Sequence, residues 1–524
     1  MIRPQAAATS SVPVLMKRAL WRIAPTRHQV AALTVLGAIF VVGLAPHLDT
    51  DLWWHLRAGQ YIALHHAVPT RDSFSFTAAG KPWTDYEWLA ELMMYWLYAA
   101  AGLWGPILLF AAVITAAFSL VYVETATAGV NRLLAAFVVA CGFGACSAVI
   151  GARIQMLTLL FLAAYASLLR LYRVRRETRI LIAFPILMLL WANLHGGYPL
   201  GLALLLAWSL GEWLNRASGR EGSLSSGELR SVLLTAGASA AVTALNPNGW
   251  RQLLFPFTLA TPNAFTNHIN EWVSPDFHMP QMMVFEALLL LLITIALTSR
   301  GRPDWTSLCV TLMATYLALS QGRNVAVWVV LVTPTLARGI QTWLRARTGD
   351  GTDPGGRPIA PATARPARSS ERPALNLALI AIASLLFAVE SAQFIGPVAL
   401  ARAERQSFPA GAMSYLRTHA LPPHVFTSYA WGGYATWTLS GRYRDFIDGR
   451  ANAVFDTRIL YDYLDAYSAA PGWRGILRKR KVQVVVVEPR APLAQVLTLS
   501  TSWRRVYSDP QAVVFVLRSA SASA

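Results

Sequence analysis

The residues most able to do chemistry stand together at positions 49 to 57, in the run Asp-Thr-Asp-Leu-Trp-Trp-His-Leu-Arg. Two carboxylates, an imidazole and a guanidinium there follow the first apolar run that is long enough to cross a membrane. Ionisable side chains at the edge of a membrane usually serve function. Asp51 and His55 are one helical turn apart and could bind a divalent cation together with Asp49. These ligands do not complete a coordination shell, so the sequence names no certain cofactor and leaves the metal unknown.

A surface helix must position these groups. The sequence predicts one from residue 51 to about residue 65, with Asp51, Trp54 and His55 on one face and tryptophan at the membrane interface. The same pattern also suits a plain helix start, in which Asp49 and Asp51 only cap the first turn. The residues by themselves do not decide between capping and chemistry.

Other ionisable residues fall in later segments that are predicted to face the same side. A second helix is expected to begin near residue 85, and it places Glu87 one turn before Glu91. His195 lies in the run Trp-Ala-Asn-Leu-His-Gly-Gly-Tyr, where paired glycines would let a backbone approach a ligand closely. Three further candidates are Arg153, Glu271 and Arg323. Taken singly, such arginines are more typical of lipid anchors, and such a histidine is more typical of a turn.

Composition places the chain in a membrane. Hydrophobic residues make up 55% of the 524 positions and charged residues only 14%, which is too apolar for one soluble core. The formal net charge of +18 is spread over short segments between apolar runs, as the positive-inside rule requires of cytoplasmic loops. We interpret the basicity as membrane topology and expect no nucleic acid as a partner.

The apolar runs predict an α-helical polytopic membrane protein of about eleven spans. They lie near residues 30–46, 104–124, 133–150, 156–172, 180–194, 199–214, 231–245, 283–298, 305–320, 324–338 and 375–395. Alternation from a cytoplasmic, basic N-terminus (1–29) puts the arginine-rich loops inside and the long loop 46–102 outside. Long ordered loops are usually functional, so this external loop, with its amphipathic helices, is expected to carry the site.

The chain is expected to divide after the tenth span. Residues 30–338 would form the transmembrane core, 339–374 a flexible cytoplasmic linker, and 375–395 the last transmembrane helix. An odd number of spans then puts residues 396–524 outside the cytoplasm. Strands are predicted there at 425–427, 445–448, 482–487 and 513–517, and helices at 409–419, 457–468 and 491–501. This pattern predicts a small extracytoplasmic α/β domain.

The run at 49–57 resembles the acidic and aromatic motif in the first external loop of oligosaccharyltransferase catalytic subunits. With the long first loop, the surface helices and the C-terminal soluble region on the same side, the chain looks like the GT-C superfamily of membrane glycosyltransferases in layout over most of its length. It is also similar to a broad group of bacterial polytopic membrane proteins with the motifs Asp-Leu-Trp-Trp-His-Leu-Arg, Pro-Thr-Arg-Asp-Ser-Phe-Ser, Trp-Thr-Asp-Tyr-Glu-Trp-Leu, Trp-Gly-Gly-Tyr and Asp-Gly-Arg. We therefore expect a multi-pass protein of the bacterial inner membrane, with its C-terminal domain in the periplasm or outside the cell.

The GT-C resemblance implies an inverting glycosyltransferase. It would move a sugar from a polyprenyl-phosphate-linked donor to a glycan, lipid or protein acceptor on the outer face. Asp51 would be the base on the acceptor hydroxyl, with Asp49 as the second choice. The arginines expected to bind the donor phosphate are Arg57, Arg153 and Arg323. The residues expected to bind substrate are Trp54, His55, Glu87, His195 and Glu271.

Two other functions stay open at this point. A transporter or flippase of lipid-linked glycan would also carry interior charges and a large outer loop, but it needs access from the cytoplasmic side. A noncatalytic scaffold for envelope assembly would use the C-terminal region as a binding module. In that region Asp448 and Arg450 could bind the acceptor, although turns formed by the neighbouring glycines explain the same motifs.

Overall fold

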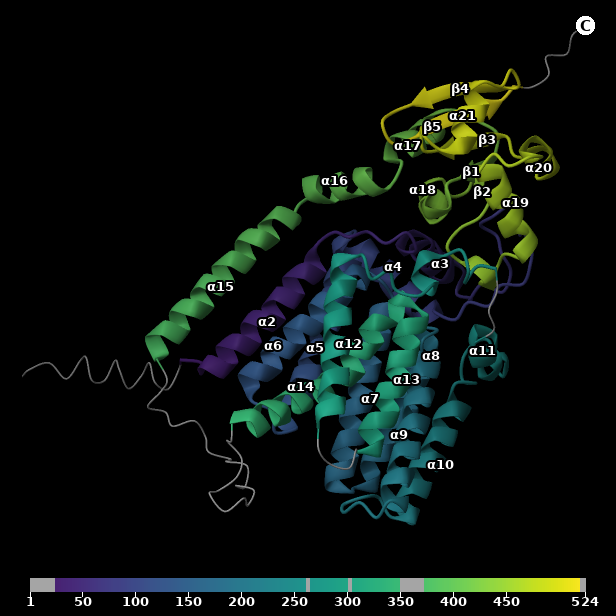
Figure 1. The fold of residues 1–524 in the computed structure, drawn as a ribbon. Coiled ribbons are helices and arrows are strands. Elements are labelled where there is room, and N and C mark those ends of the chain that lie inside the picture. The colour runs from purple at the N-terminus through teal and green to yellow at the C-terminus, as the bar shows by residue number, and fades with distance from the viewer. Residues whose placement is uncertain (1–23, 261–263, 300–303, 349–371, 519–524) are drawn as a thin grey trace, which may run out of the picture.

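The computed structural model describes residues 24–260, 264–299, 304–348 and 372–518. A bundle of long helices carries a small β-sheet beyond one of its ends (Figure 1). The bundle helices are α2 (Arg27–Leu44), α5 (Trp104–Thr127), α6 (Arg132–Cys146), α7 (Gln155–Arg175), α8 (Ala183–Leu194), α9 (Pro199–Ala217), α10 (Ser226–Val242), α12 (Pro280–Thr298), α13 (Trp305–Ser320), α14 (Val325–Thr348) and α15 (Pro373–Phe394).

All eleven apolar runs of the sequence are helical, and seven of them are long and apolar enough to cross a membrane. These seven are α2, α5, α6, α7, α12, α14 and α15. The helices α8 and α13 belong to shorter apolar segments. The structure therefore supports a polytopic helical protein, whereas the count of eleven spans stays a prediction.

The helix α15 illustrates why lipid must be the solvent. It packs against α2 at the side of the bundle, and protein covers almost none of its apolar surface (Figure 1). Leu379, Ile382, Leu385 and Leu386 are all exposed. A helix that is apolar all round and uncovered by protein is stable only where hydrocarbon surrounds it.

Two shorter helices lie over the end of the bundle that faces the sheet. The helix α3 (Leu52–His65) packs closely against α4 (Trp88–Ala101), and both lie where the sequence predicted helices, from residue 51 and from near residue 85. Between them, Ser75 forms a parallel bridge with Asp445, and the Phe76 amide donates to the Asp445 carbonyl at 3.1 Å. The first loop thereby adds its backbone to the edge of the C-terminal sheet.

The C-terminal sheet has the strand order β2-β1-β3-β5-β4. Its strands are β1 (His424–Thr427), β2 (Arg444–Asp445), β3 (Val484–Val487), β4 (Trp503–Ser508) and β5 (Val513–Leu517). The strand β1 runs parallel to β2 and β3, and β5 runs antiparallel to β3 and β4. The α/β character of the region is as expected. The strand β4 was missed, because its sequence Trp-Arg-Arg-Val-Tyr-Ser is mostly exposed at the sheet edge and lacks a buried apolar run.

Helices precede this sheet in sequence and connect its strands. They are α16 (Pro397–Ser407), α17 (Ala410–Thr418), α18 (Gly432–Thr438), α19 (Thr457–Tyr467), α20 (Trp473–Lys479) and α21 (Pro492–Thr498). The helices α17, α19 and α21 fall in predicted segments. The remaining three are short or polar and gave no clear period in the sequence.

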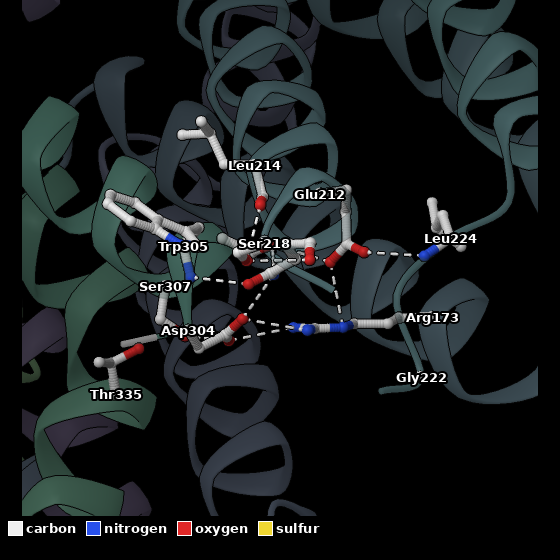
Figure 2. Close-up of polar contacts among 12 residues, drawn as sticks. Arg173, Glu212, Leu214, Ser218, Gly222, Leu224, Asp304, Trp305, Ser307 and Thr335 are labelled. Atoms are coloured by element: carbon white, nitrogen blue, oxygen red, sulfur yellow. Dashed lines mark hydrogen bonds and ion pairs between the residues drawn. The ribbon is translucent and has the colours of Figure 1, made fainter. Parts of the chain in front are cut away.

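The opposite end of the bundle is held by a compact polar cluster (Figure 2). Arg173 on α7 pairs with Glu212 on α9 at 3.1 Å and with Asp304, just before α13, at 3.0 Å. Asn215 donates to Asp304 at 2.8 Å, and Thr306 donates to Glu212 at 2.8 Å. These contacts tie three helix ends together on the side away from the sheet.

Candidate functional site

Three of the predicted site residues form one ion network at the sheet end of the bundle. Arg153, which lies just before α7, pairs with Asp49 and with Glu271. The two acidic partners raise the pKa of Arg153 above its usual range, although burial opposes this. Segments more than a hundred residues apart in sequence are brought together by this one guanidinium.

Asp51 does not cap the helix that follows it. It occupies the position before α3, but its side chain accepts no hydrogen bond from the first-turn amides. The Asp51 carboxylate instead accepts from the Trp54 indole N–H at 3.0 Å, and Asp49 accepts from the Asp51 amide at 2.8 Å. Asp51 therefore does not cap α3, and Asp49 binds only the amide of Asp51, which precedes the helix.

Burial and a like charge keep the Asp51 carboxyl weakly acidic. Desolvation, followed by the negative charge of Asp49, raises the pKa of Asp51 to about 8. A carboxyl with that pKa is a much stronger proton acceptor than an exposed aspartate once it has ionised.

The C-terminal glycine motifs lie directly over Asp51. A Cβ at Gly449 would overlap the Asp51 carboxylate, and a Cβ at Gly433 would lie 2.9 Å from the Thr50 carbonyl. Only residues without a side chain fit at this distance. The Tyr429 hydroxyl, from the same region, is buried and makes no hydrogen bond to any residue in the described ranges. The sequence motifs Trp-Gly-Gly-Tyr and Asp-Gly-Arg therefore form a cover over the start of α3.

A second cluster joins α3 and α4 to the turn between α8 and α9. His55 Nδ1 lies 3.0 Å from Glu91, and His55 Nε2 lies 3.6 Å from Glu87. Glu87 also lies 3.3 Å from His195 Nε2, and it accepts from the Gly196 amide at 3.3 Å. His55, Glu87 and His195, which were predicted separately, thus form one buried chain with Glu91.

The hydrogen bonds around His195 define its protonation state. The Gly197 amide donates to His195 Nδ1 at 3.0 Å, so this nitrogen is an acceptor and the proton lies on Nε2. Thr158 also contacts Nδ1, at 2.6 Å, and it accepts from the Trp191 indole at 3.1 Å. Burial and the nearby Arg323 charge lower the pKa of His195 to about 3, so the ring is neutral and donates to Glu87.

Burial raises the pKa values of the acidic side chains in this second cluster. Burial raises the pKa of Glu87 to about 7 and that of Asp85 to about 6. Burial and the Asp85 charge raise the pKa of Glu91 well above its usual range, and burial lowers the pKa of His55. At pH 7 His55 and His195 are therefore neutral and Glu91 is protonated, whereas Asp85 is largely ionised and Glu87 is about half ionised.

Arg323 stands between the two clusters. Its guanidinium lies 4.8 Å from the centre of the Trp272 ring, and it makes no hydrogen bond or ion pair with any residue that the structure describes. Its charge acts on Asp51 and Glu271 in one cluster and on Glu87 and His195 in the other. A desolvated guanidinium with free donors is suited to an anionic ligand.

Arg57 is not brought into this group. It donates to Gln60 at 2.5 Å and lies 5.5 Å from the centre of the Phe74 ring. No contact joins it to Asp51, Arg153 or Arg323 in the part of the chain that is described. Its position one face away on α3 separates it from the site.

The C-terminal pair Asp448 and Arg450 is used within the fold. Arg450 binds Asp448 at 2.7 Å and Asp72 of the first loop at 2.7 Å, and the side chains of all three are fully buried. The Arg450 guanidinium also lies over the Trp83 ring at 4.7 Å. These contacts fasten the first loop to the sheet, so they favour the structural interpretation of the Asp-Gly-Arg motif over acceptor binding.

Sequence reasoning missed three members of the second cluster. Glu91 was visible as the partner of Glu87 one turn away, but nothing in the sequence marked its contact with His55. Asp85 and Thr158 gave weaker signals, because Thr158 stands inside the apolar run of α7. Within the described ranges, no group of three or more His, Cys, Asp or Glu side chains is arranged to hold a metal ion. The divalent cation considered for Asp49, Asp51 and His55 thus has no ligand set in these ranges.

Comparison with solved structures identifies the class of fold. The archaeal oligosaccharyltransferase AglB from Archaeoglobus fulgidus, solved with an inhibitory peptide and a dolichol-phosphate, aligns with a TM-score of 0.55 at 12% identity, over 87% of this chain and 69% of that chain. ArnT from Cupriavidus metallidurans, bound to undecaprenyl phosphate, aligns with a TM-score of 0.48 at 12% identity, over 97% of this chain and 98% of that chain. No family model and no curated protein matches the sequence.

The chain therefore shares its fold with the archaeal oligosaccharyltransferase over most of its length, which agrees with the resemblance in layout that the sequence showed. The likeness at 12% identity concerns the fold, and the activity must be argued from the residues of the site.

Proposed function

We propose that this protein is an integral membrane glycosyltransferase that uses a polyprenyl-phosphate-linked sugar as donor. One observation carries the proposal: the buried Asp51 carboxyl and the Arg323 guanidinium, which has no hydrogen bond or ion pair among the described residues, belong to one group of interacting charges at the end of the bundle nearest the C-terminal sheet. A proton acceptor beside a free anion-binding group is what transfer from a sugar phosphate requires.

The proposed reaction balances without a further reactant. The acceptor oxygen forms a bond to the anomeric carbon of the sugar while the bond from that carbon to the phosphate oxygen breaks, so the configuration inverts. The acceptor proton passes to the Asp51 carboxylate. The polyprenyl phosphate leaves with the bonding electrons and one more negative charge, which Arg323 stabilises.

The neighbouring residues hold this arrangement. Arg153 fixes Asp49 and Glu271 beside Asp51, and its charge is already satisfied by those two carboxylates. We therefore assign the phosphate to Arg323 and give Arg153 a positioning role. His55, Glu87 and His195 form a hydrogen-bonded wall that binds the sugar or acceptor, together with Trp54. Asp49 remains the alternative base.

The proposed orientation puts Asp51 and the C-terminal region on the outer side of the bacterial inner membrane. The arginines Arg173, Arg175, Arg176, Arg216 and Arg230 lie at the other end of the bundle. A cytoplasmic location of that end, and of the N-terminus, agrees with the positive-inside rule. In this orientation the acceptor would be a glycan, lipid or protein that is presented at the outer leaflet, and residues 396–524 would form the extracytoplasmic domain.

A transporter or flippase is the main competing function. It would need a polar path between the two ends, whereas the described core between them consists mainly of large apolar side chains such as Trp328, Phe285 and Phe118. A noncatalytic scaffold would not need an ionisable residue under a glycine cover. Neither a transporter nor a scaffold forms a glycosidic bond, so the glycans and lipid-linked sugars of a variant strain distinguish both from a transferase.

The test compares strains at matched membrane levels of protein. A deletion strain would carry wild-type protein, Asp51→Asn, or Asp276→Asn as a control that makes the same change at an exposed carboxylate. We expect Asp51→Asn, like the deletion, to accumulate a polyprenyl-linked sugar and to lose one envelope glycan, while Asp276→Asn behaves as wild type. If Asp51→Asn restores the glycan while the deletion lacks it, the transferase proposal fails.

A further inference from the structure

A separate pocket lies at the end of the bundle that is remote from Asp51. It opens between the end of α9 and the start of α10, has a volume of about 430 Å³, and is lined by Trp213, Arg216, Ser226, Arg230 and Leu233. The two helices pack side by side at this end (Figure 1). None of these residues takes part in the site described above.

The two arginines of this pocket have no side-chain partner among the described residues. Neither Arg216 nor Arg230 makes a side-chain hydrogen bond or ion pair with a residue in the described ranges, and both are exposed. Their neighbours differ: Arg173 is paired with Glu212, and Arg176 with Glu228. Two guanidinium groups that face one space without an acid are suited to a phosphate, which accepts from several donors at once.

The start of α10 adds to this preference. The helix begins at Ser226, which lines the pocket, so the N-terminal end of α10 borders the same space. Ser225 caps the helix by accepting from the Glu228 amide, the Glu228 carboxylate accepts from the Ser225 amide, and the Ser226 hydroxyl has no hydrogen bond within the described ranges. The pocket therefore combines two full charges, a helix end and a hydroxyl.

An apolar track leads from the pocket along the bundle. Leu206, Leu210 and Trp213 lie on one face of α9 and are 57%, 51% and 53% exposed. Leu233 on α10 is 47% exposed beside them. Such a track offers nothing to a water-soluble phosphate, whereas an acyl chain would cover it.

We propose that this pocket binds the phosphate of an anionic phospholipid from the leaflet opposite to Asp51. Arg216 and Arg230 hold the phosphate, Ser226 donates to it, and one acyl chain lies along Leu206, Leu210 and Trp213. Basic pockets between helices at a membrane surface bind anionic head groups in this way. The ligand is bound and released unchanged.

The experiment counts lipids on the full-length protein in dodecyl maltoside by native mass spectrometry. Dioleoylphosphatidylglycerol and dioleoylphosphatidylcholine are titrated separately into wild type, into R216Q/R230Q, and into R175Q/R179Q. The last variant removes two exposed arginines at the same end but outside the pocket. An arginine near a lipid surface contributes about fivefold in affinity, so R216Q/R230Q should bind phosphatidylglycerol about 25-fold more weakly.

The control variant should bind phosphatidylglycerol within about twofold of wild type if the pocket is specific. Equal losses in both double variants would mean general attraction to a basic surface and would overturn the proposal. So would equal binding of the two lipids by wild type. Displacement of the lipid by excess inorganic phosphate would overturn the lipid as occupant. Trp213→Ala, which leaves both arginines in place, should also weaken phosphatidylglycerol binding.

Discussion

The two ends of the bundle differ in how their buried charged side chains are paired. At the end drawn in Figure 2, Arg173 is met by Glu212 and Asp304, and both carboxylates accept further hydrogen bonds. Hydrogen bonds and the Arg173 charge hold the pKa of Asp304 well below its usual range. At the other end burial raises the pKa of Asp51 to about 8, and Arg323 has no acidic hydrogen-bond or ion-pair partner among the described residues.

This difference in charge pairing indicates which polar cluster stabilises the fold and which one is suited to bind a substrate and react with it. A buried charge that is paired and hydrogen-bonded recovers much of its desolvation cost, whereas an unmatched buried charge lowers the free energy of unfolding. A protein retains unmatched groups where a ligand or a reaction requires them. Helix packing therefore explains the Arg173 cluster, and the proposed transfer reaction explains the Asp51 cluster.

The largest effect is expected from Asp51→Asn. The amide keeps the shape and can still contact Trp54, but it cannot accept a proton, so the transfer rate should fall by about 10²- to 10⁴-fold. The melting temperature should stay close to that of wild type, because Asp51, with a pKa of about 8, is already largely uncharged at pH 7. A transfer assay with purified protein and a thermal melt would measure both. If the variant has a much lower melting temperature and an unchanged kcat, Asp51 stabilises the fold and does not act in the reaction.

The opposite pattern is expected from Arg173→Met. It leaves Glu212, which is fully buried, without its cation, so the free energy of unfolding should fall by about 3 to 5 kcal/mol. The folded fraction should transfer sugar at the wild-type rate. Thermal melting and the specific activity of monodisperse protein check the two halves of this prediction. Arg179→Met, at an exposed arginine of the same end, is the matched control and should change neither.

An intermediate effect is expected from Arg323→Gln. Loss of the guanidinium should weaken donor binding and the stabilisation of the leaving phosphate, with kcat/KM reduced by about 10²-fold. Stability should be unaffected or slightly increased, because an unpaired buried charge is removed. Arg57→Gln on the neighbouring face of α3 serves as the control. Equal losses of kcat/KM in the two variants would contradict a specific role of Arg323 in binding the donor phosphate.

The smallest effect is a shift in pH dependence. Because the pKa of Asp51 lies at about 8, its carboxylate is scarce below that pH, and the transfer rate should rise as pH increases through about 8. The Asp49 charge contributes to that raised pKa, so Asp49→Asn should lower it and move the rise to lower pH. The pH profile of kcat/KM in the two proteins is the measurement. A midpoint that does not move would exclude Asp51 as the group that titrates.

Much of the helical architecture could be predicted because it depends on local signals. Each apolar run is long enough to form a helix by itself, and the arginines between runs indicate the ends. The strand β3, with the sequence Val-Val-Val-Val, was evident for the same reason. The edge strand β4 and the short helix α20 were not, because neighbours across the sheet stabilise them and their own sequences carry no clear period.

The site could be predicted only in part. Asp51, His55 and Glu87 were recognisable as polar groups beside apolar runs, but the role of Thr158 was hidden because a single hydroxyl within a membrane helix is usually satisfied by its own backbone. The separation of Arg57 from Arg323 was equally hidden. It depends on which face of α3 meets the bundle, and this follows from packing with α4 and the C-terminal sheet.

The sequence by itself determined that this chain lies in a membrane and where its helices run, and it marked several ionisable residues as candidates, because hydropathy and charge act locally along the chain. Only the tertiary structure decided that Asp51 is covered by Gly449, that Arg153 pairs with Asp49 and Glu271, and that Arg323 has no acidic partner among the described residues. Burial and charge pairing arise between segments that are far apart in sequence, so no local pattern can record them.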